Sequence, residues 1–168
     1  VEKPLQGHAY IPLPAAGRAQ VGRYRFPAEF RGVPAFVSPL SRARETAELA
    51  GAGSLAVEPL LIEMDWGRWE GMRLAELRER FGAGMEANER RGLDFRPDGG
   101  ESPREVQGRL AAFFDRLNRL DPRPESCIAV THKGVIRAAL ALACRWDMTG
   151  KPPVRLDWSA LHVVRLAP

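Results

Sequence analysis

Residues 128–134, Ile-Ala-Val-Thr-His-Lys-Gly, give the clearest indication of the fold of this chain. The apolar start predicts a short buried strand, and Gly134 lets the chain turn from that strand into a helix. His132 therefore falls at the carboxyl end of a strand, beside the free N–H groups of a helix start. Such groups and the helix dipole attract anions, phosphate among them. From position alone, His132 fits an anion site and a histidine bonded to a nearby backbone group equally well.

The segments on either side repeat this alternation of strand and helix. Short apolar runs predict strands over residues 35–37, 55–57, 127–130 and 160–166. Apolar spacing and capping residues predict helices over residues 15–24, 39–50, 73–91, 103–120 and 134–146. Alternation of this kind indicates an α/β fold, a three-layer α/β/α sandwich with a mostly parallel sheet. Ligands of such folds bind at the carboxyl edge of the sheet.

The composition is that of an ordinary globular protein. With 168 residues and 45% hydrophobic content, residues 1–168 are expected to form a single domain around one core. The longest apolar stretch, residues 138–144, falls short of the roughly 18 residues that cross a bilayer. The N-terminus shows no secretion signal, so the expected location is the cytoplasm. Cys127 and Cys144 have no metal-ligand spacing and are predicted to be reduced core residues.

The charge pattern bears on the partners. A net charge of +4 suits a small anionic substrate. The arginines alternate with acids, as over residues 42–45 and 76–80, and do not form a basic stripe with aromatic residues. Neither nucleic acid nor a membrane is therefore an expected partner. A homodimer is compatible with the sequence, which does not specify the oligomeric state.

Residues 38–47 form a second strand end that passes into a helix. Ser38 is predicted to be the helix cap and Pro39 the first helical residue. Arg42, one turn inside, can direct its planar guanidinium at an oxyanion and bind two oxygens at once. The alternative is a surface arginine, which is the commoner role of an arginine in a first helical turn.

Residues 63–71 combine two tryptophans with three acids in a loop. Trp66 and Trp69 are predicted either to wall a site or to fill a small separate core. A carboxyl group held against indole rings is shielded from water, which raises its pKa toward the working pH. Glu63 or Glu70 is therefore a candidate proton donor.

Taken together and in order, these segments resemble the histidine phosphatase superfamily, whose fold is phosphoglycerate-mutase-like. The resembling segments are residues 5–8, 12–13 and 17–20; residues 38–47; residues 63–71; residues 97–102 with Val106 and Arg109; and residues 130–134. Their joint order is far more specific than any one of them. They span almost the whole chain.

The resemblance implies a cytoplasmic phosphatase acting on a small phosphorylated substrate through a phosphohistidine, with no metal and no cofactor. It implies that Arg42 and His132 hold the phosphoryl oxygens and that Glu63 protonates the leaving alcohol. Gln6 and Gly7 would line the substrate site. Trp66 and Lys133 complete the predicted substrate-binding set, Lys133 either adding charge at its mouth or pointing to solvent.

The sequence departs from the family pattern at one place. An Arg-His-Gly tripeptide ending the first, central strand carries the nucleophile in that family, and residues 1–168 contain no such tripeptide. Neither His8 nor His162 is expected to replace it. Loss of a central strand exposes backbone groups that cost about 1 to 3 kcal/mol each when buried, so without it the chain is not expected to fold as the family does. The hypothesis is that the natural protein has an upstream strand.

Two other functions stay open from the sequence. A phosphoglycerate-mutase-type phosphotransferase shares the same site, although the chain is short where mutases usually carry an insertion. A non-catalytic phosphate-binding protein would keep the site without the nucleophile. The sequence does not say which phosphomonoester is the substrate.

Overall fold

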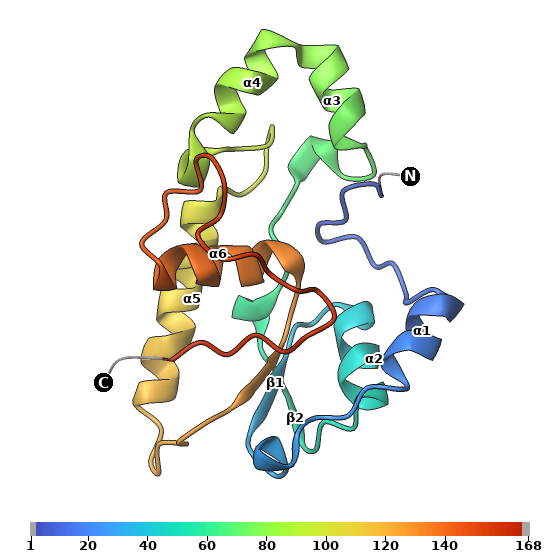
Figure 1. The fold of residues 1–168 in the computed structure, drawn as a ribbon, viewed down its shortest axis with the longest axis vertical. Helices are drawn as coiled ribbons and strands as arrows, with labels where there is room; N and C mark the ends of the chain where they lie inside the picture. Colours follow the sequence, from blue (N-terminus) through green and yellow to red (C-terminus); the bar gives the residue numbers. More distant parts are fainter. Residues whose placement is uncertain (1–2, 166–168) are drawn as a thin grey trace.

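The computed structural model describes residues 3–165 and has a parallel sheet at its centre (Figure 1). Its three strands are β1 (Ala35–Val37), β2 (Leu55–Val57) and β3 (Ile128–Val130), in the order β2-β1-β3. β1 is central and pairs in parallel with both neighbours. Three of the four predicted strands are confirmed. The carboxyl ends of β1 and β3 lie at the same edge of the sheet because the two strands run in parallel.

Within residues 3–165 the chain also forms six α-helices and four short 3-10 helices. The α-helices are α1 (Ala15–Val21), α2 (Ser41–Leu49), α3 (Leu74–Phe81), α4 (Ala83–Glu89), α5 (Pro103–Asn118) and α6 (Lys133–Ala143). The 3-10 helices are Ala28–Phe30, Pro59–Leu61, Gly67–Trp69 and Gly92–Asp94. None of the helices within residues 3–165 is long and apolar enough to cross a membrane.

Helices cover both faces of the sheet (Figure 1). Adjacent residues of a strand point to opposite faces. Val37 packs against α2 through Ala43 and Ala47, whereas Phe36 faces α5. There its ring meets Phe113, with 5.3 Å between ring centroids. The three-layer α/β/α arrangement with a parallel sheet is therefore confirmed.

The predicted helix over residues 73–91 is two helices. α3 and α4 meet at Gly82, whose φ of +47° breaks the helical path and is a backbone conformation that suits glycine. Leu77 and Met85 are buried on either side of this break and pack with Trp69 in a small separate core. The second of the two predictions for Trp69 is thus the one observed.

The predicted start of α2 is wrong. The helix begins at Ser41, with Leu40 as its N-cap residue, so Ser38 and Pro39 lie outside it. The Ser38 hydroxyl does not cap the helix because it bonds to His132, at 2.7 Å from Nε2. By contrast, the predicted cap of α5 is confirmed: Ser102 and Glu105 bond each other's backbone N–H groups.

The last part of the chain also differs from prediction. Residues 160–165 form no strand, and Leu166, the predicted end of that strand, lies outside the described residues. The outer edge of β3 therefore pairs with no strand within residues 3–165. Cys127 is partly buried, but Cys144 is exposed, because α6 ends at Ala143 and the chain there leaves the core.

Two leucines, one in the middle of α5 and one just past its C-terminal end, test the core. Leu110 is 2% exposed and Leu120, predicted from its spacing to lie in the core, is 43% exposed because it follows the last turn of the helix. Leu110→Ala should lower the free energy of unfolding by about 2 to 5 kcal/mol, since it leaves a cavity. Leu120→Ala should cost less than about 1 kcal/mol. Urea unfolding measures both, and equal losses would contradict this core.

Candidate functional site

Two strand ends meet at the carboxyl edge of the sheet. The backbone N–H of Ser38, directly after β1, donates to the carbonyl oxygen of Val130 at 3.0 Å. The Ser38 hydroxyl and His132 Nε2 are 2.7 Å apart. Ser38 is fully buried and His132 is 8% exposed. The two turns into α2 and α6 are thus joined by a backbone bond and a side-chain bond.

Burial keeps the His132 ring neutral. Burial first, and then the nearby charges of Arg42, Arg109 and His8, lower the pKa of His132 to about 3. The Ser38 oxygen accepts from the N–H of Leu40 at 3.3 Å, so its own hydrogen is free to be donated to His132 Nε2. In that arrangement the neutral ring carries its hydrogen on Nδ1. His132 then has one N–H donor to offer another group.

Glu63 lies against the start of α6. Its carboxylate accepts from the N–H of Met64 at 2.8 Å and from that of Gly134 at 3.3 Å, and it is 7% exposed. A Cβ on residue 134 would lie 2.4 Å from Glu63 Oε1, so only glycine leaves room for this carboxyl group. Burial raises the pKa of Glu63, and the two N–H groups with Arg42 and Arg109 oppose that rise.

Arg42 links α2 to the N-terminal loop. Its guanidinium donates to the carbonyl oxygens of Gly7 at 2.8 Å, Ala9 at 2.9 Å and Gln6 at 3.4 Å. These bonds use three of the five N–H donors of an arginine. Burial lowers the pKa of Arg42, while the carboxylates of Glu63 and Glu70 raise it.

The N-terminal loop also brings a third group to this edge. The ring of His8 lies 2.7 Å from the carbonyl oxygen of Glu63 through Nε2, and the backbone N–H of His8 donates to Glu70. A Cβ on Gly7 would lie 2.0 Å from Glu70 Oε1, so a larger residue there would displace that carboxylate. His8 received no role from its sequence position, because a histidine in a loop has no pattern that marks it.

The side chains of two other predicted residues contact aromatic rings. Trp66 is half-buried, and its ring packs against that of Phe95, with 6.0 Å between centroids. Lys133 is exposed, and its amine lies 4.9 Å from the centre of the Trp158 ring. The structure therefore gathers Gln6, Gly7, Arg42, Glu63 and His132, and leaves Trp66 and Lys133 with aromatic neighbours of their own.

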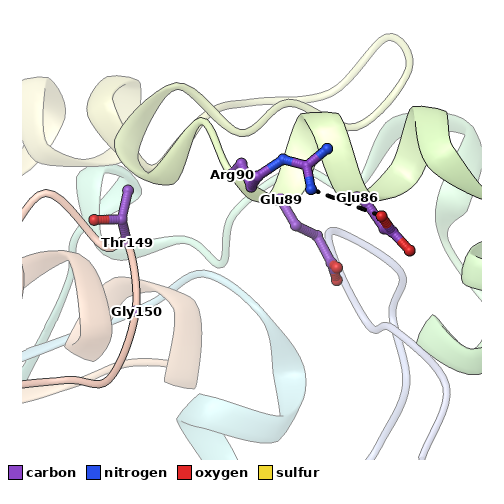
Figure 2. A pocket seen from close by; sticks show the side chains of 5 residues that line it. All are labelled: Glu86, Glu89, Arg90, Thr149 and Gly150. Atoms are coloured by element: carbon purple, nitrogen blue, oxygen red, sulfur yellow. Dashed lines mark ion pairs between the residues drawn. The ribbon is translucent and has the colours of Figure 1, made fainter.

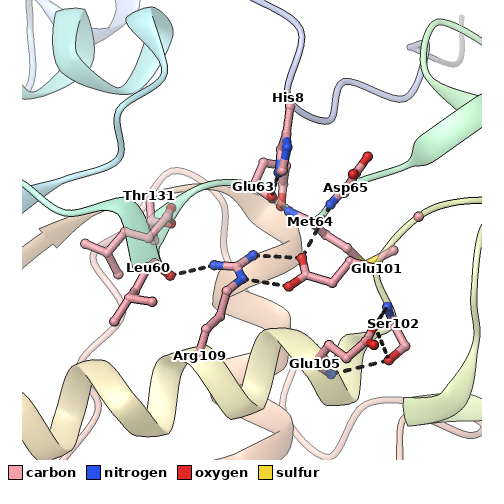
Figure 3. Close-up of polar contacts among 12 residues, drawn as sticks. His8, Leu60, Glu63, Met64, Asp65, Glu101, Ser102, Glu105, Arg109 and Thr131 are labelled. Atoms are coloured by element: carbon pink, nitrogen blue, oxygen red, sulfur yellow. Dashed lines mark hydrogen bonds and ion pairs between the residues drawn. The ribbon is translucent and has the colours of Figure 1, made fainter.

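Three groups at this edge carry no sequence signal of a site. The sequence predicts a helix cap for Ser38 and a loop for Glu101, and Arg109 belongs to a segment that resembles the family without a predicted role. Arg109 donates to Glu101 and to the carbonyl oxygen of Leu60, beneath the segment that carries Glu63 (Figure 3). No local pattern marks such residues, because their partners are far away in the sequence.

A hollow of about 340 Å³ lies elsewhere, between α4 and residues 149–150 (Figure 2). Arg90 in its wall pairs with Glu86 one helical turn away, at 3.7 Å. Neither Arg42 nor His132 lines it, so it is not the predicted site. In the part of the chain that the structure describes, no three His, Cys, Asp or Glu side chains are arranged to hold a metal ion.

Comparison with known proteins agrees with this fold. The model of the histidine phosphatase superfamily (branch 1) matches residues 1–168. The chain therefore belongs to the histidine phosphatase superfamily, as its motifs indicated, a superfamily of phosphatases and mutases.

Individual relatives include both kinds of enzyme. A phosphoglycerate mutase of Thermus thermophilus is 32% identical, with a TM-score of 0.66 over 99% of this chain and 90% of that one. An α-ribazole phosphatase of Shigella flexneri is 26% identical, with a TM-score of 0.69 over 84% of this chain and 71% of that one. A 2,3-bisphosphoglycerate-dependent phosphoglycerate mutase of Gloeobacter violaceus is 29% identical over 83% of this chain and 68% of its own length. Three mycobacterial relatives are also matched, and the chain spans only 31% of the length of each of them.

The low pKa of His132 makes its titration a test of this geometry. The unfolded chain takes up a proton near pH 6.5, whereas folded His132 stays neutral down to about pH 3. Stability should therefore fall as the pH drops from about 6.5 toward 3, by up to about 1.4 kcal/mol for each pH unit.

NMR titration of the His132 ring, assigned with His132→Gln, measures the pKa directly. Urea unfolding between pH 4 and 7 should show a shallower pH slope in His132→Gln than in the parent. A ring that titrates near pH 6.5 would contradict the buried, neutral state.

Proposed function

We propose that this protein hydrolyses a small phosphomonoester through a phosphohistidine intermediate. One observation carries the proposal: Arg42, His132 and Glu63 come from three separate segments, and Arg42 lies near enough to both His132 and Glu63 to interact electrostatically with each, at the edge where β1 and β3 end and α6 begins. A cation, an N–H donor and a carboxylic acid around one point are the groups that phosphoryl transfer needs when the protein itself supplies the charge.

The anion would bind between Arg42 and His132. Arg42 keeps N–H donors beyond those that hold Gly7 and Ala9. His132 offers the N–H of its neutral ring, and it precedes α6 directly, so the dipole of an 11-residue helix adds to the attraction. These donors are held in place before the substrate arrives, which is the condition under which they stabilise a transition state.

Glu63 would act as the general acid. Its raised pKa favours the protonated form, because the buried carboxyl group is poorly solvated when charged. A histidine nitrogen forms the bond to phosphorus while the bond from phosphorus to the ester oxygen breaks, and that oxygen leaves as an alcohol with the Glu63 proton. Water then attacks the phosphohistidine and returns a proton to Glu63. The bond from nitrogen to phosphorus breaks, and inorganic phosphate leaves.

The nucleophile in this proposal is a histidine at the end of the hypothesised upstream strand. The outer edge of β3 carries no strand within residues 3–165, so its backbone groups are free of strand partners there. A parallel strand at that edge would end beside His132, since parallel strands share their carboxyl edge. This placement supports the hypothesis and needs no change in β1 or β3.

A mutase-type phosphotransferase is the second candidate. The phosphoglycerate mutase of Thermus thermophilus is matched over 99% of this chain, which favours it more than the motifs alone do. A mutase returns the phosphoryl group to a second hydroxyl of the substrate, whereas a hydrolase gives it to water. Release of inorganic phosphate from 3-phosphoglycerate and formation of 2-phosphoglycerate separate the two.

Replacing the anion-binding groups tests the proposal. Arg42→Ala and His132→Ala should each lower kcat/KM of the full-length protein for p-nitrophenyl phosphate by about 100- to 1,000-fold, the usual cost of one lost oxyanion donor. Arg44→Ala is the matched control, because Arg44 lies on the same helix and is exposed.

Full activity of the Arg42 and His132 variants would remove both residues from the site. Phosphate binding by the parent without turnover would favour the non-catalytic binding protein, and calorimetry with inorganic phosphate detects it.

The acid role of Glu63 has its own test. Glu63→Gln should slow the hydrolysis of alkyl phosphates by about 100-fold or more, because their leaving alkoxides need a proton, and slow p-nitrophenyl phosphate far less. The measurement is kcat/KM over a series of leaving groups. Equal slowing across the series would take Glu63 out of this role.

A further inference from the structure

The segment that carries Glu63 is held on its α5 side by a partly buried ion pair. Arg109, on α5, donates through Nε and Nη2 to the two carboxylate oxygens of Glu101, at 2.8 and 3.1 Å. Its Nη1 donates to the carbonyl oxygen of Leu60 at 2.5 Å. Figure 3 shows the guanidinium lying between Leu60 and Glu101, on the α5 side of the segment with Glu63.

Glu101 bonds to the same segment on the C-terminal side of Glu63. Its backbone N–H donates to the carbonyl oxygen of Asp65 at 2.9 Å, and its carboxylate accepts from the N–H of Asp65 at 3.4 Å. One ion pair thus holds residue 60 and residue 65 at once, and Glu63 lies between them. A backbone held at both ends has little freedom to turn its middle residue.

Two further hydrogen bonds, from Thr131 and His8, hold the same segment. The Thr131 hydroxyl donates to the carbonyl oxygen of Leu61 at 2.6 Å, and His8 bonds the carbonyl oxygen of Glu63. The Glu63 carboxylate itself is bonded to backbone N–H groups, those of Met64 and Gly134. Its direction therefore depends on where the backbone of residues 60–65 lies.

We propose that Arg109, held by Glu101, is a positioning residue for Glu63, fixing residues 60–65 so that the carboxyl group stays at the start of α6. This inference rests on the proposed function, since it names what positions its acid. The side chains of Arg109 and Glu101 are 13% and 19% exposed, so the pair is shielded and geometrically constrained. A lysine keeps the charge but cannot reach both carboxylate oxygens and a carbonyl together, because it lacks the planar fork.

The charge of Arg109 adds a second effect on the same acid. It opposes the rise in the pKa of Glu63 that burial causes. The effect of the charge can be separated from that of the hydrogen-bonding geometry, because Arg109→Lys keeps the charge and changes only the geometry.

The experiment compares Arg109→Lys and Glu101→Gln with a matched control, Arg104→Lys. Arg104 lies on the same helix and makes the same two-pronged contact, to Asp94 at 2.7 and 2.9 Å, but the partners are 58% and 50% exposed and touch no part of residues 60–65. Exposed pairs of this kind contribute about 0.2 to 1 kcal/mol. The control therefore removes a two-pronged contact of the same kind from the same helix without changing the contacts of residues 60–65.

Three quantities are measured: kcat/KM for an alkyl phosphate and for p-nitrophenyl phosphate, the affinity for inorganic phosphate, and the amide NMR signals of Met64 and Gly134. Arg109→Lys and Glu101→Gln should lower kcat/KM for the alkyl phosphate by about 10- to 100-fold, as expected of a misplaced acid. Both variants should change kcat/KM for p-nitrophenyl phosphate and the affinity for inorganic phosphate by less than about threefold. Both amide signals should shift. Arg104→Lys should change none of these.

Equal slowing of both esters, or unmoved amide signals at Met64 and Gly134, would overturn the positioning role. If the parent protein hydrolyses neither ester and binds no phosphate, the proposed function fails instead. The amide signals then decide the inference alone, because they report the carboxyl position without turnover. Glu101→Gln guards against a folding failure of Arg109→Lys, since it leaves the arginine in place, and thermal melting identifies a variant that has lost its fold.

Discussion

The parallel register of β1 and β3 is the constraint on which the rest of the structure depends. It places Ser38 and His132, which are distant in sequence, at one edge of the sheet and within 2.7 Å of each other. α2 and α6 both start there, so Arg42 and the N–H of Gly134 reach the same edge. The core formed by α5 and α6 then holds the other face of the sheet, and through Arg109 it holds the segment with Glu63 as well.

Burial at this edge shifts the pKa of each titratable group in a different way. These different shifts give the site groups that could bind an anion and transfer a proton. The same loss of solvent keeps His132 neutral and raises the pKa of Glu63, while the nearby carboxylates of Glu63 and Glu70 help Arg42 to keep its charge. A neutral donor, a carboxyl group with a raised pKa and a cation thus arise from one environment because their charged forms differ in sign and in neighbours. Two glycines are part of this arrangement, since a Cβ at residue 7 or 134 would collide with Glu70 or Glu63.

Much of this arrangement was predictable from local patterns. Neighbouring residues specify the apolar runs of β1, β2 and β3, the capping box of α5, the position of His132 at the end of a strand and that of Glu63 in a loop. The structure agrees with these predictions. The errors occurred where a distant partner overrides a local preference. Ser38 has the right identity for a helix cap, but it bonds to a histidine 94 residues away. A helical spacing over residues 73–91 hides the break at Gly82, and Leu120 has the right spacing for the core but lies past the end of its helix.

By itself, the sequence determined the fold class, the family and which side chains stand at the ends of strands, because hydrophobic periodicity, caps and the order of motifs are local properties of a chain. Only the tertiary structure decided what those side chains touch: the carbonyl oxygens of residues 6, 7 and 9 on Arg42, the hydroxyl of Ser38 on His132, and the clamp of Arg109 and Glu101 on the segment of Glu63. The physical reason is that a hydrogen bond or a burial energy depends on distance in space. Distance in space is set by how the sheet and its two helical layers pack, and no stretch of neighbouring residues contains that information.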